Sequence, residues 1–113
     1  MTTTTIFEKI IKGEIPCDKL YEDELCIAFN DIAAQAPIHY LVIPKKPIPS
    51  LRECTEIDKN LLGHLILVGQ KIAEEKKLSH WRTVINTGAE SGQTVFHLHL
   101  HFLSGRAMLW PPG

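Results

Sequence analysis

The stretch His97-Leu98-His99-Leu100-His101-Phe102 alternates histidine with a large apolar residue and decides the fold of this chain. Successive side chains of a β-strand point to opposite faces, so the alternation predicts a strand over residues 95–103. The apolar side chains would face a core, and the three histidines would share the other face at intervals of about 6.5–7 Å. A solvated sheet face is the plain alternative. Three imidazoles in strict alternation favour a functional site.

The sequence around this strand predicts two helices and further strands. A short helix with Ile6, Phe7, Ile10 and Ile11 on one side stops at Gly13, and a long helix follows residues 55–58, which resemble a capping box. Strands are expected at residues 20–21, 26–29, 39–43 and 81–86, and a glycine-bearing loop at 87–93. The apolar stripe of the long helix is Ile57, Leu61, Leu65, Val68 and Ile72. The pattern predicts an α+β fold, with an antiparallel sheet covered by helices on one side.

Composition and charge limit the classes of protein to which this chain can belong. The chain has 113 residues, 44% of them hydrophobic and 22% charged, which predicts one globular domain over residues 1–113. Twelve basic and thirteen acidic residues leave a net charge of −1, which argues against nucleic-acid binding. No apolar run reaches the roughly 20 residues of a membrane span, and residues 1–5 lack the features of a signal peptide. Three cysteines without a CxxC pair are typical of reduced thiols, so we expect a cytoplasmic protein with no membrane partner.

Histidines at this spacing are compatible with two kinds of chemistry. Zinc could take two neighbouring histidines, with His39 as a further ligand and water in the fourth place. The outer two of the three lie about 13 Å apart on a straight strand, which is too far for one ion. The other reading is catalysis without a metal or cofactor, in which one neutral imidazole is the nucleophile and a neighbour carries a proton.

The histidine stretch resembles the signature of the histidine triad (HIT) family, and other segments resemble its HINT branch in the same order. These segments are Ile6-Phe7-x-Lys9-Ile10-Ile11, Ala28-Phe29-x-Asp31-Ile32, Gln35-Ala36-Pro37-x-His39, Leu41-Val42-Ile43-Pro44-Lys45-Lys46, Leu61-Leu62-Gly63-His64-Leu65 and Trp110-Pro111-Pro112-Gly113. The resemblance implies a homodimeric HIT-like fold, with a five-stranded antiparallel sheet, one long helix and one short helix. It also implies a cytoplasmic hydrolase that cleaves the P–N bond of purine nucleoside 5′-phosphoramidates.

The resemblance also implies roles for the histidines. His99 would attack the α-phosphorus and form a nucleotidyl-histidine, which water then hydrolyses. His101 would donate to the non-bridging phosphate oxygens. His97, and behind it His39, would orient the other nitrogen of the nucleophile and fix its tautomer.

The same comparison implies a nucleotide site for an AMP-like or GMP-like ligand. Gly92, Gln93, Thr94 and Val95 would present backbone N–H groups and a hydroxyl to the phosphate. Threonine at 94 departs from the HINT branch, which commonly has serine there, and is more typical of the Fhit-like branch. Asp31 would accept from the ribose hydroxyls. The residues implied for the nucleoside pocket are Ile6, Phe7, Ile10, Phe29, Asp31, Ile32 and Asn86.

Three functions remain open at this point. The first is a nucleoside phosphoramidase, and the second is a dinucleoside polyphosphate or other nucleotidyl hydrolase with the same site. The third is a nucleotide-binding regulatory protein with little turnover. We also expect the C-terminal segment to pack as an extended arm, because consecutive prolines exclude a helix. The resemblance to the HINT branch implies that Trp110 of this arm contributes to the site of a partner subunit.

Overall fold

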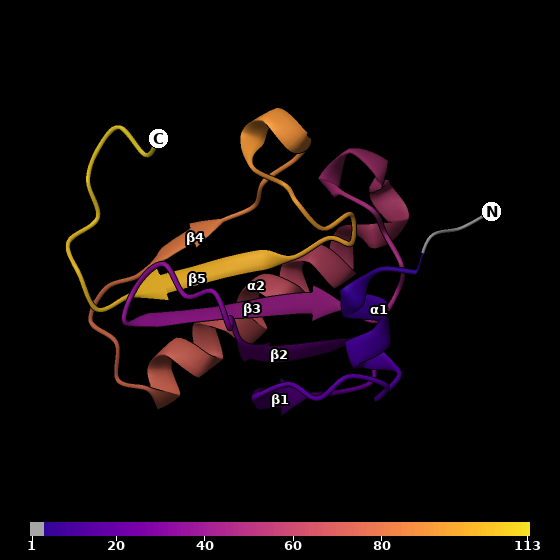
Figure 1. Ribbon diagram of the computed structural model, residues 1–113, viewed down its shortest axis with the longest axis horizontal. Coiled ribbons are helices and arrows are strands. Elements are labelled where there is room, and N and C mark those ends of the chain that lie inside the picture. Colours follow the sequence, from indigo (N-terminus) through magenta and orange to yellow (C-terminus); the bar gives the residue numbers. More distant parts are fainter. Residues whose placement is uncertain (1–3) are drawn as a thin grey trace.

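A computed structural model describes residues 4–113 and places one antiparallel sheet between two helices. The strands are β1 (Lys19–Glu22), β2 (Cys26–Asn30), β3 (Ile38–Pro44), β4 (Arg82–Val84) and β5 (Leu100–Ser104), in the order β1-β2-β3-β5-β4. The helices are α1 (Ile6–Ile11) and α2 (Lys59–Glu75). Short 3₁₀ turns lie at Leu51–Glu53, Glu56–Asp58 and Ala89–Ser91. The five-stranded sheet with one short and one long helix confirms the predicted fold (Figure 1).

The two helices lie on opposite faces of the sheet, so the prediction of helices on one side was wrong (Figure 1). Alternation along β2 and β3 explains why. Ala28 and Val42 belong to the buried cluster that packs against α2, whereas their neighbours Phe29 and Leu41 belong to a second cluster with Phe7 of α1. The central strands are therefore apolar on both faces, and each face requires a cover.

Local sequence determines where the helices begin. Thr5 forms a capping box with Glu8, and Gly13, at φ 77°, follows the end of α1. Thr55 forms a second capping box with Asp58, which confirms the reading of residues 55–58, but a 3₁₀ turn precedes α2 there. Because that turn breaks the helical phase, Ile57 is 87% exposed and does not belong to the apolar stripe.

The core face of α2 approaches the sheet most closely at Gly69. The Tyr40 hydroxyl donates a hydrogen bond to the Gly69 carbonyl over 2.8 Å, and the Phe102 ring lies against the glycine Cα. A Cβ placed at this position would lie 1.9 Å from Phe102 Cζ. The sheet and helix can pack at this distance only because residue 69 has no side chain.

The last two strands are shorter than predicted. β5 begins at Leu100, so His97 and His99 precede it, and β4 covers only three of the six residues expected at 81–86. The pairing of β4 with β5 runs from Arg82–Leu103 to Val84–His101, and the chain leaves the ladder on either side. Within residues 4–113, no helix is long and apolar enough to cross a membrane.

Candidate active site

The three histidines of the alternating stretch all face the α1 side of the sheet. Leu98 and Leu100 belong to the cluster under α2, which confirms the predicted alternation even where the chain is not paired as a strand. The Phe7 ring lies edge-on to two of the histidines, with ring centroids 6.3 Å from His97 and 5.0 Å from His99. The His99 and His101 rings are 4.9 Å apart. A single aromatic side chain of α1 therefore supports the histidines.

Hydrogen bonding determines the tautomer of His99. Its Nδ1 lies 2.7 Å from the carbonyl oxygen of His97. A carbonyl oxygen only accepts, so Nδ1 carries the proton and Nε2 keeps its lone pair when the ring is neutral. Burial is the largest cause that lowers the pKa of His99, and this favours the neutral ring. These are the properties of an imidazole nucleophile.

A second chain of hydrogen bonds determines the tautomer of His101. The backbone N–H of Gln35 donates to Nδ1 of His39 over 3.0 Å, so neutral His39 carries its proton on Nε2. That Nε2 lies 2.9 Å from Nδ1 of His101 and donates to it. Neutral His101 then carries its own proton on Nε2. Burial, followed by the neighbouring His99 and His39, lowers the pKa of His101 to about 4.

The structure differs from the expectation for two histidines. His97 contacts Nδ1 of His99 as expected, but through its backbone carbonyl, whereas the His97 imidazole donates its Nε2 proton to the Pro44 carbonyl over 2.7 Å. His39 contacts His101 and does not lie behind His97. The sequence contained the spacing of these residues but no information on which backbone atoms would lie beside each ring.

An apolar cavity of about 260 Å³ opens beside His99 and His101. Asp31 lies at its wall and comes within 3.4 Å of His39 Nε2. The cavity collects ten of the predicted site residues, which come from α1, from β2 and the residues just after it, and from the segment that leads into β5. They are Ile6, Phe7, Ile10, Phe29, Asp31, Ile32, Thr94, Val95, His99 and His101.

Asn86 does not line this cavity, contrary to the predicted nucleoside pocket. It lies in an adjoining hollow of about 460 Å³, together with His39, Gly92 and Thr94. Asp31 and His101 belong to both spaces. Asn86 follows β4, which is the edge strand beside β5, whereas the cavity is lined by α1 and β2.

The loop before the histidines provides fewer phosphate donors than expected. The N–H of Gly92 donates to the Ala89 carbonyl and the N–H of Gln93 donates to the Gly88 carbonyl, so both are already satisfied. The buried Gln93 side chain binds the carbonyls of Pro49 and Val95 and stiffens the loop. The N–H groups of Thr94 and Val95 make no hydrogen bond within residues 4–113. These two residues, with the Thr94 hydroxyl, are therefore the available donors.

The C-terminal segment leaves β5 and runs past β4 (Figure 1). The guanidinium of Arg82 donates to the Leu109 carbonyl over 2.9 Å and lies 5.9 Å from the centroid of the Trp110 ring. Trp110 is nevertheless 81% exposed and lines none of the spaces around the histidines described above. Its predicted place in a partner subunit's site therefore stays a prediction.

Asp31, His39 and His101 are also the residues of the site that could hold a metal ion. One ligand atom from each lies within 4.8 Å of the others, which suits the oxygen and nitrogen ligands of zinc. The zinc reading expected two neighbouring histidines of the alternating stretch together with His39. The set contains His39 but only one histidine of that stretch, His101.

Comparisons with known proteins agree with this geometry. Residues 4–109 match the family described as "Scavenger mRNA decapping enzyme C-term binding". A HIT-like protein of Synechococcus elongatus is 57% identical over the whole of both chains, and one of Synechocystis is 55% identical over the whole of both. The chain belongs to the histidine triad family. The crystal structure of a HIT family hydrolase from Legionella pneumophila superposes with a TM-score of 0.94 at 43% identity, covering 97% of this chain and 100% of that one. A histidine triad protein from Clostridium difficile gives 0.90 at 41%, covering 96% and 97%.

Two contributors to the HIT site were missed from the sequence. Gln35 acts through its backbone N–H, which fixes the tautomer of His39, and Pro44 acts through its carbonyl, which binds His97. Every residue has a backbone carbonyl and almost every residue has a backbone N–H. The residue type therefore could not indicate these two contributions. Gln93 was expected to bind phosphate, and its buried amide instead holds the loop together.

Proposed function

We propose that this HIT protein hydrolyses the P–N bond of purine nucleoside 5′-phosphoramidates by way of a nucleotidyl-histidine. The observation that carries this proposal is the pair of tautomers: His99 has a free lone pair on Nε2, and neighbouring His101 has a proton on Nε2. A nucleophile and a hydrogen-bond donor thus stand with rings 4.9 Å apart at one end of the apolar cavity. This arrangement suits attack on a phosphorus whose oxygens need stabilisation.

The nucleoside would occupy the cavity between α1 and β2. Its base would lie among apolar side chains such as Phe29 and Ile10, and Asp31 at the wall would accept from the ribose hydroxyls. The α-phosphate would then lie near His99, with the free N–H groups of Thr94 and Val95 as further donors. Apolar walls with a few convergent polar groups are typical of small-ligand sites.

The reaction would proceed in two displacements. The lone pair of His99 Nε2 forms a bond to phosphorus, the P–N bond to the amine breaks, and the departing amine takes a proton from the solvent. Water then attacks the phosphorus, the bond to His99 breaks, the proton that the water loses returns to the solvent, and a nucleoside monophosphate is released. His101 donates its Nε2 proton in a hydrogen bond to the phosphate oxygens throughout, and a bound phosphate anion would oppose the burial that lowers its pKa.

Turnover of adenosine 5′-phosphoramidate, measured beside a diadenosine polyphosphate, tests the proposal. We expect faster hydrolysis of the phosphoramidate and a fall of at least about 10³-fold in kcat for His99→Ala. The matched control is His80→Ala, which changes an exposed histidine. Acid quenching of the wild type should trap an adduct on His99. Faster cleavage of the polyphosphate would favour a dinucleoside polyphosphate hydrolase, and inactivity on both would favour a nucleotide-binding protein.

The cluster of Asp31, His39 and His101 makes a zinc-dependent hydrolase the second candidate. In the proposed reaction His39 and His101 instead share a hydrogen bond and need no ion. Dialysis against a chelator, followed by elemental analysis, separates the two readings. Full activity in metal-free protein supports the proposal, and a loss that zinc alone restores favours the metal-dependent reading.

A further inference from the structure

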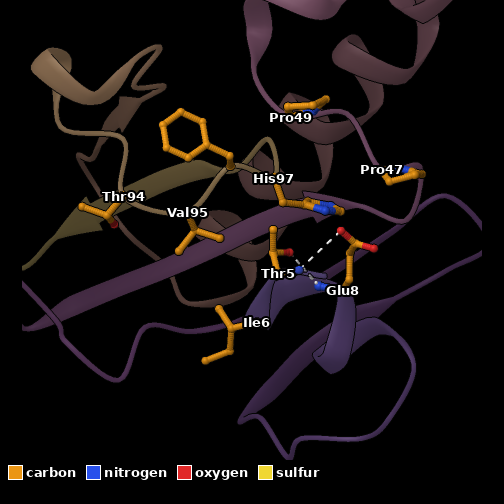
Figure 2. A pocket seen from close by; sticks show the side chains of 9 residues that line it. Thr5, Ile6, Glu8, Pro47, Pro49, Thr94, Val95 and His97 are labelled. Atoms are coloured by element: carbon orange, nitrogen blue, oxygen red, sulfur yellow. Dashed lines mark hydrogen bonds between the residues drawn. The ribbon is translucent and has the colours of Figure 1, made fainter. Parts of the chain in front are cut away.

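A second pocket, which no predicted role accounts for, adjoins the nucleotide cavity. Its volume is about 590 Å³, and it shares Ile6, Thr94 and Val95 with that cavity. Figure 2 shows Thr94 and Val95 on one side of this pocket and Pro47, Pro49 and His97 on the other. A ligand anchored in the nucleotide cavity therefore needs only to pass Thr94 and Val95 to enter the second pocket.

The walls of this pocket are largely apolar. Pro47, Pro49 and Val95 line it, and so does Phe96, whose side chain is half exposed. A hydrocarbon chain or an aromatic ring could lie against these residues and remove apolar surface from water. The pocket is thus suited to the carbon skeleton of a ligand.

One carboxylate, that of Glu8, supplies the charge of the pocket. In Figure 2 it lies beneath Pro47 and next to His97. Within residues 4–113 no cation lies within 4.0 Å of it. Lys45 and Lys46, which precede Pro47 in the sequence, are paired with Glu22 and Asp58. The only polar partner of the Glu8 carboxylate within residues 4–113 is the N–H of Thr5 at 3.5 Å, a long hydrogen bond.

The other titratable group of the pocket does not offset this charge. Burial is the largest cause that lowers the pKa of His97, so its ring is neutral near pH 7. The Nε2 proton of that ring is also donated to the Pro44 carbonyl. The pocket therefore combines apolar walls with one carboxylate that no cation among residues 4–113 pairs, and it favours a ligand with a positive charge.

We propose that this pocket holds the amine side of the substrate and that Glu8 selects amines whose carbon chain carries a second, cationic group. This inference rests on the proposed function, because a phosphoramidate carries an amine on the same phosphorus as the bound nucleoside. The substrate class is then an adenosine or guanosine phosphoramidate of a diamine or of a basic amino-acid side chain.

Three adenosine 5′-phosphoramidates of equal chain length test the inference. Their amines are 1,6-diaminohexane linked at one end, hexylamine, and 6-aminohexanoate. We expect kcat/KM to fall in that order, with about fivefold between the cationic and neutral compounds, as for a partly exposed ion pair. Glu8→Gln keeps an oxygen that can accept from the Thr5 N–H and should abolish this preference, and Glu8→Lys should reverse it. Glu90→Gln, an equal loss of charge in the loop near Asn86, is the matched control and should keep the wild-type order.

The outcomes separate this inference from the function on which it rests. Hydrolysis of all three compounds at equal kcat/KM by the wild type would overturn the role of Glu8 and leave the phosphoramidase intact. A preference that survives in Glu8→Gln would do the same. Failure to cleave any of the three, together with inactivity on adenosine phosphoramidate, would overturn the proposed function itself.

Discussion

His39 Nε2 and His101 Nδ1 lie 2.9 Å apart, although 62 positions separate the two residues in the sequence. The contact is possible because β3 and β5 are neighbours, with His39 paired to Leu103 and Leu41 paired to His101. His39 is itself fixed by the Gln35 N–H. It is therefore a positioning residue that acts on His101 through one hydrogen bond.

Replacement of His39 should impair catalysis more than substrate binding. We expect His39→Leu to lower kcat about tenfold or more, with a smaller change in KM, because His101 loses the donor that fixes its tautomer. His39→Gln retains an N–H donor and should restore part of the rate. A neighbouring imidazole that lowers the pKa of His101 would also be lost, so this pKa should rise from about 4 when followed by NMR. An unchanged His101 titration in His39→Leu would contradict the assigned contact.

Stability should depend on pH in the range where the site histidines titrate. Burial lowers the pKa of His39, His97, His99 and His101 below the ordinary value of 6.5. Below pH 6.5 the unfolded chain then binds more protons than the folded chain. The contribution of these histidines to the free energy of unfolding is therefore complete above pH 6.5 and is lost as the pH falls toward 4.

Thermal unfolding between pH 7.5 and 4.5 measures this effect. Tm should change little between pH 7.5 and 6.5 and should fall from pH 6.5 to 4.5, less steeply in His101→Asn than in the control His80→Asn. The pKa of Glu22 is lowered to about 2, so the stability that this residue contributes is lost only below its ordinary pKa of 4.5. That loss falls outside the measured range. Equal slopes in the two variants would show that His101 does not carry the dependence.

Two glycines of α2 should respond to alanine in opposite directions. Gly69→Ala places a Cβ 1.9 Å from Phe102 Cζ and should reduce the free energy of unfolding by about 1–3 kcal/mol or more. Gly63→Ala meets no atom within 4 Å and should raise it by about 0.5–1 kcal/mol through helix propensity. Denaturant titration of both variants gives the comparison, and a stable Gly69→Ala protein would mean that α2 can move away from the sheet.

The C-terminal arm and the expected homodimer can be tested together. Deletion of residues 107–113 removes the exposed Trp110 and the contact of Leu109 with Arg82, neither of which is part of the core. We expect the shortened protein to change its preference among amine leaving groups while its Tm changes little. Sedimentation should show a dimer at assay concentration. An active monomer would contradict the dimer, and an unchanged leaving-group preference would contradict the role of the arm.

Side-chain patterns predicted most of the fold, and the resemblance to the histidine triad family implied most of the residues of the cavity. Alternation in residues 97–102 places the histidines and leucines on opposite faces, because that pattern depends only on extended backbone. β2 and β3 are instead apolar at successive positions, which indicates two buried faces, whereas we expected helices on one side only. Ladder ends were harder to predict, since the pairing of β4 and β5 depends on tertiary contacts and not on the residues of either strand.

The details of the site depended on atoms common to every residue. The His97 carbonyl determines which nitrogen of His99 carries a proton, and the Gln35 N–H does the same for His39 and, through it, His101. Any residue at these positions offers the same groups, so only a three-dimensional structure can assign them. The sequence therefore indicates which side chains take part, and the backbone determines what each can do.

The arrangement of α1 and α2 on opposite faces of the sheet also bears on how this protein could be redesigned. The packing of Tyr40, Leu65, Leu100 and Phe102 lies under α2, and the nucleotide cavity and the Glu8 pocket lie on the other side. A mutant library restricted to exposed and half-buried positions of α1 and residues 94–96 would vary ligand choice without disturbing the larger core. Directed evolution of new specificities could thus begin from this scaffold without prior stabilisation.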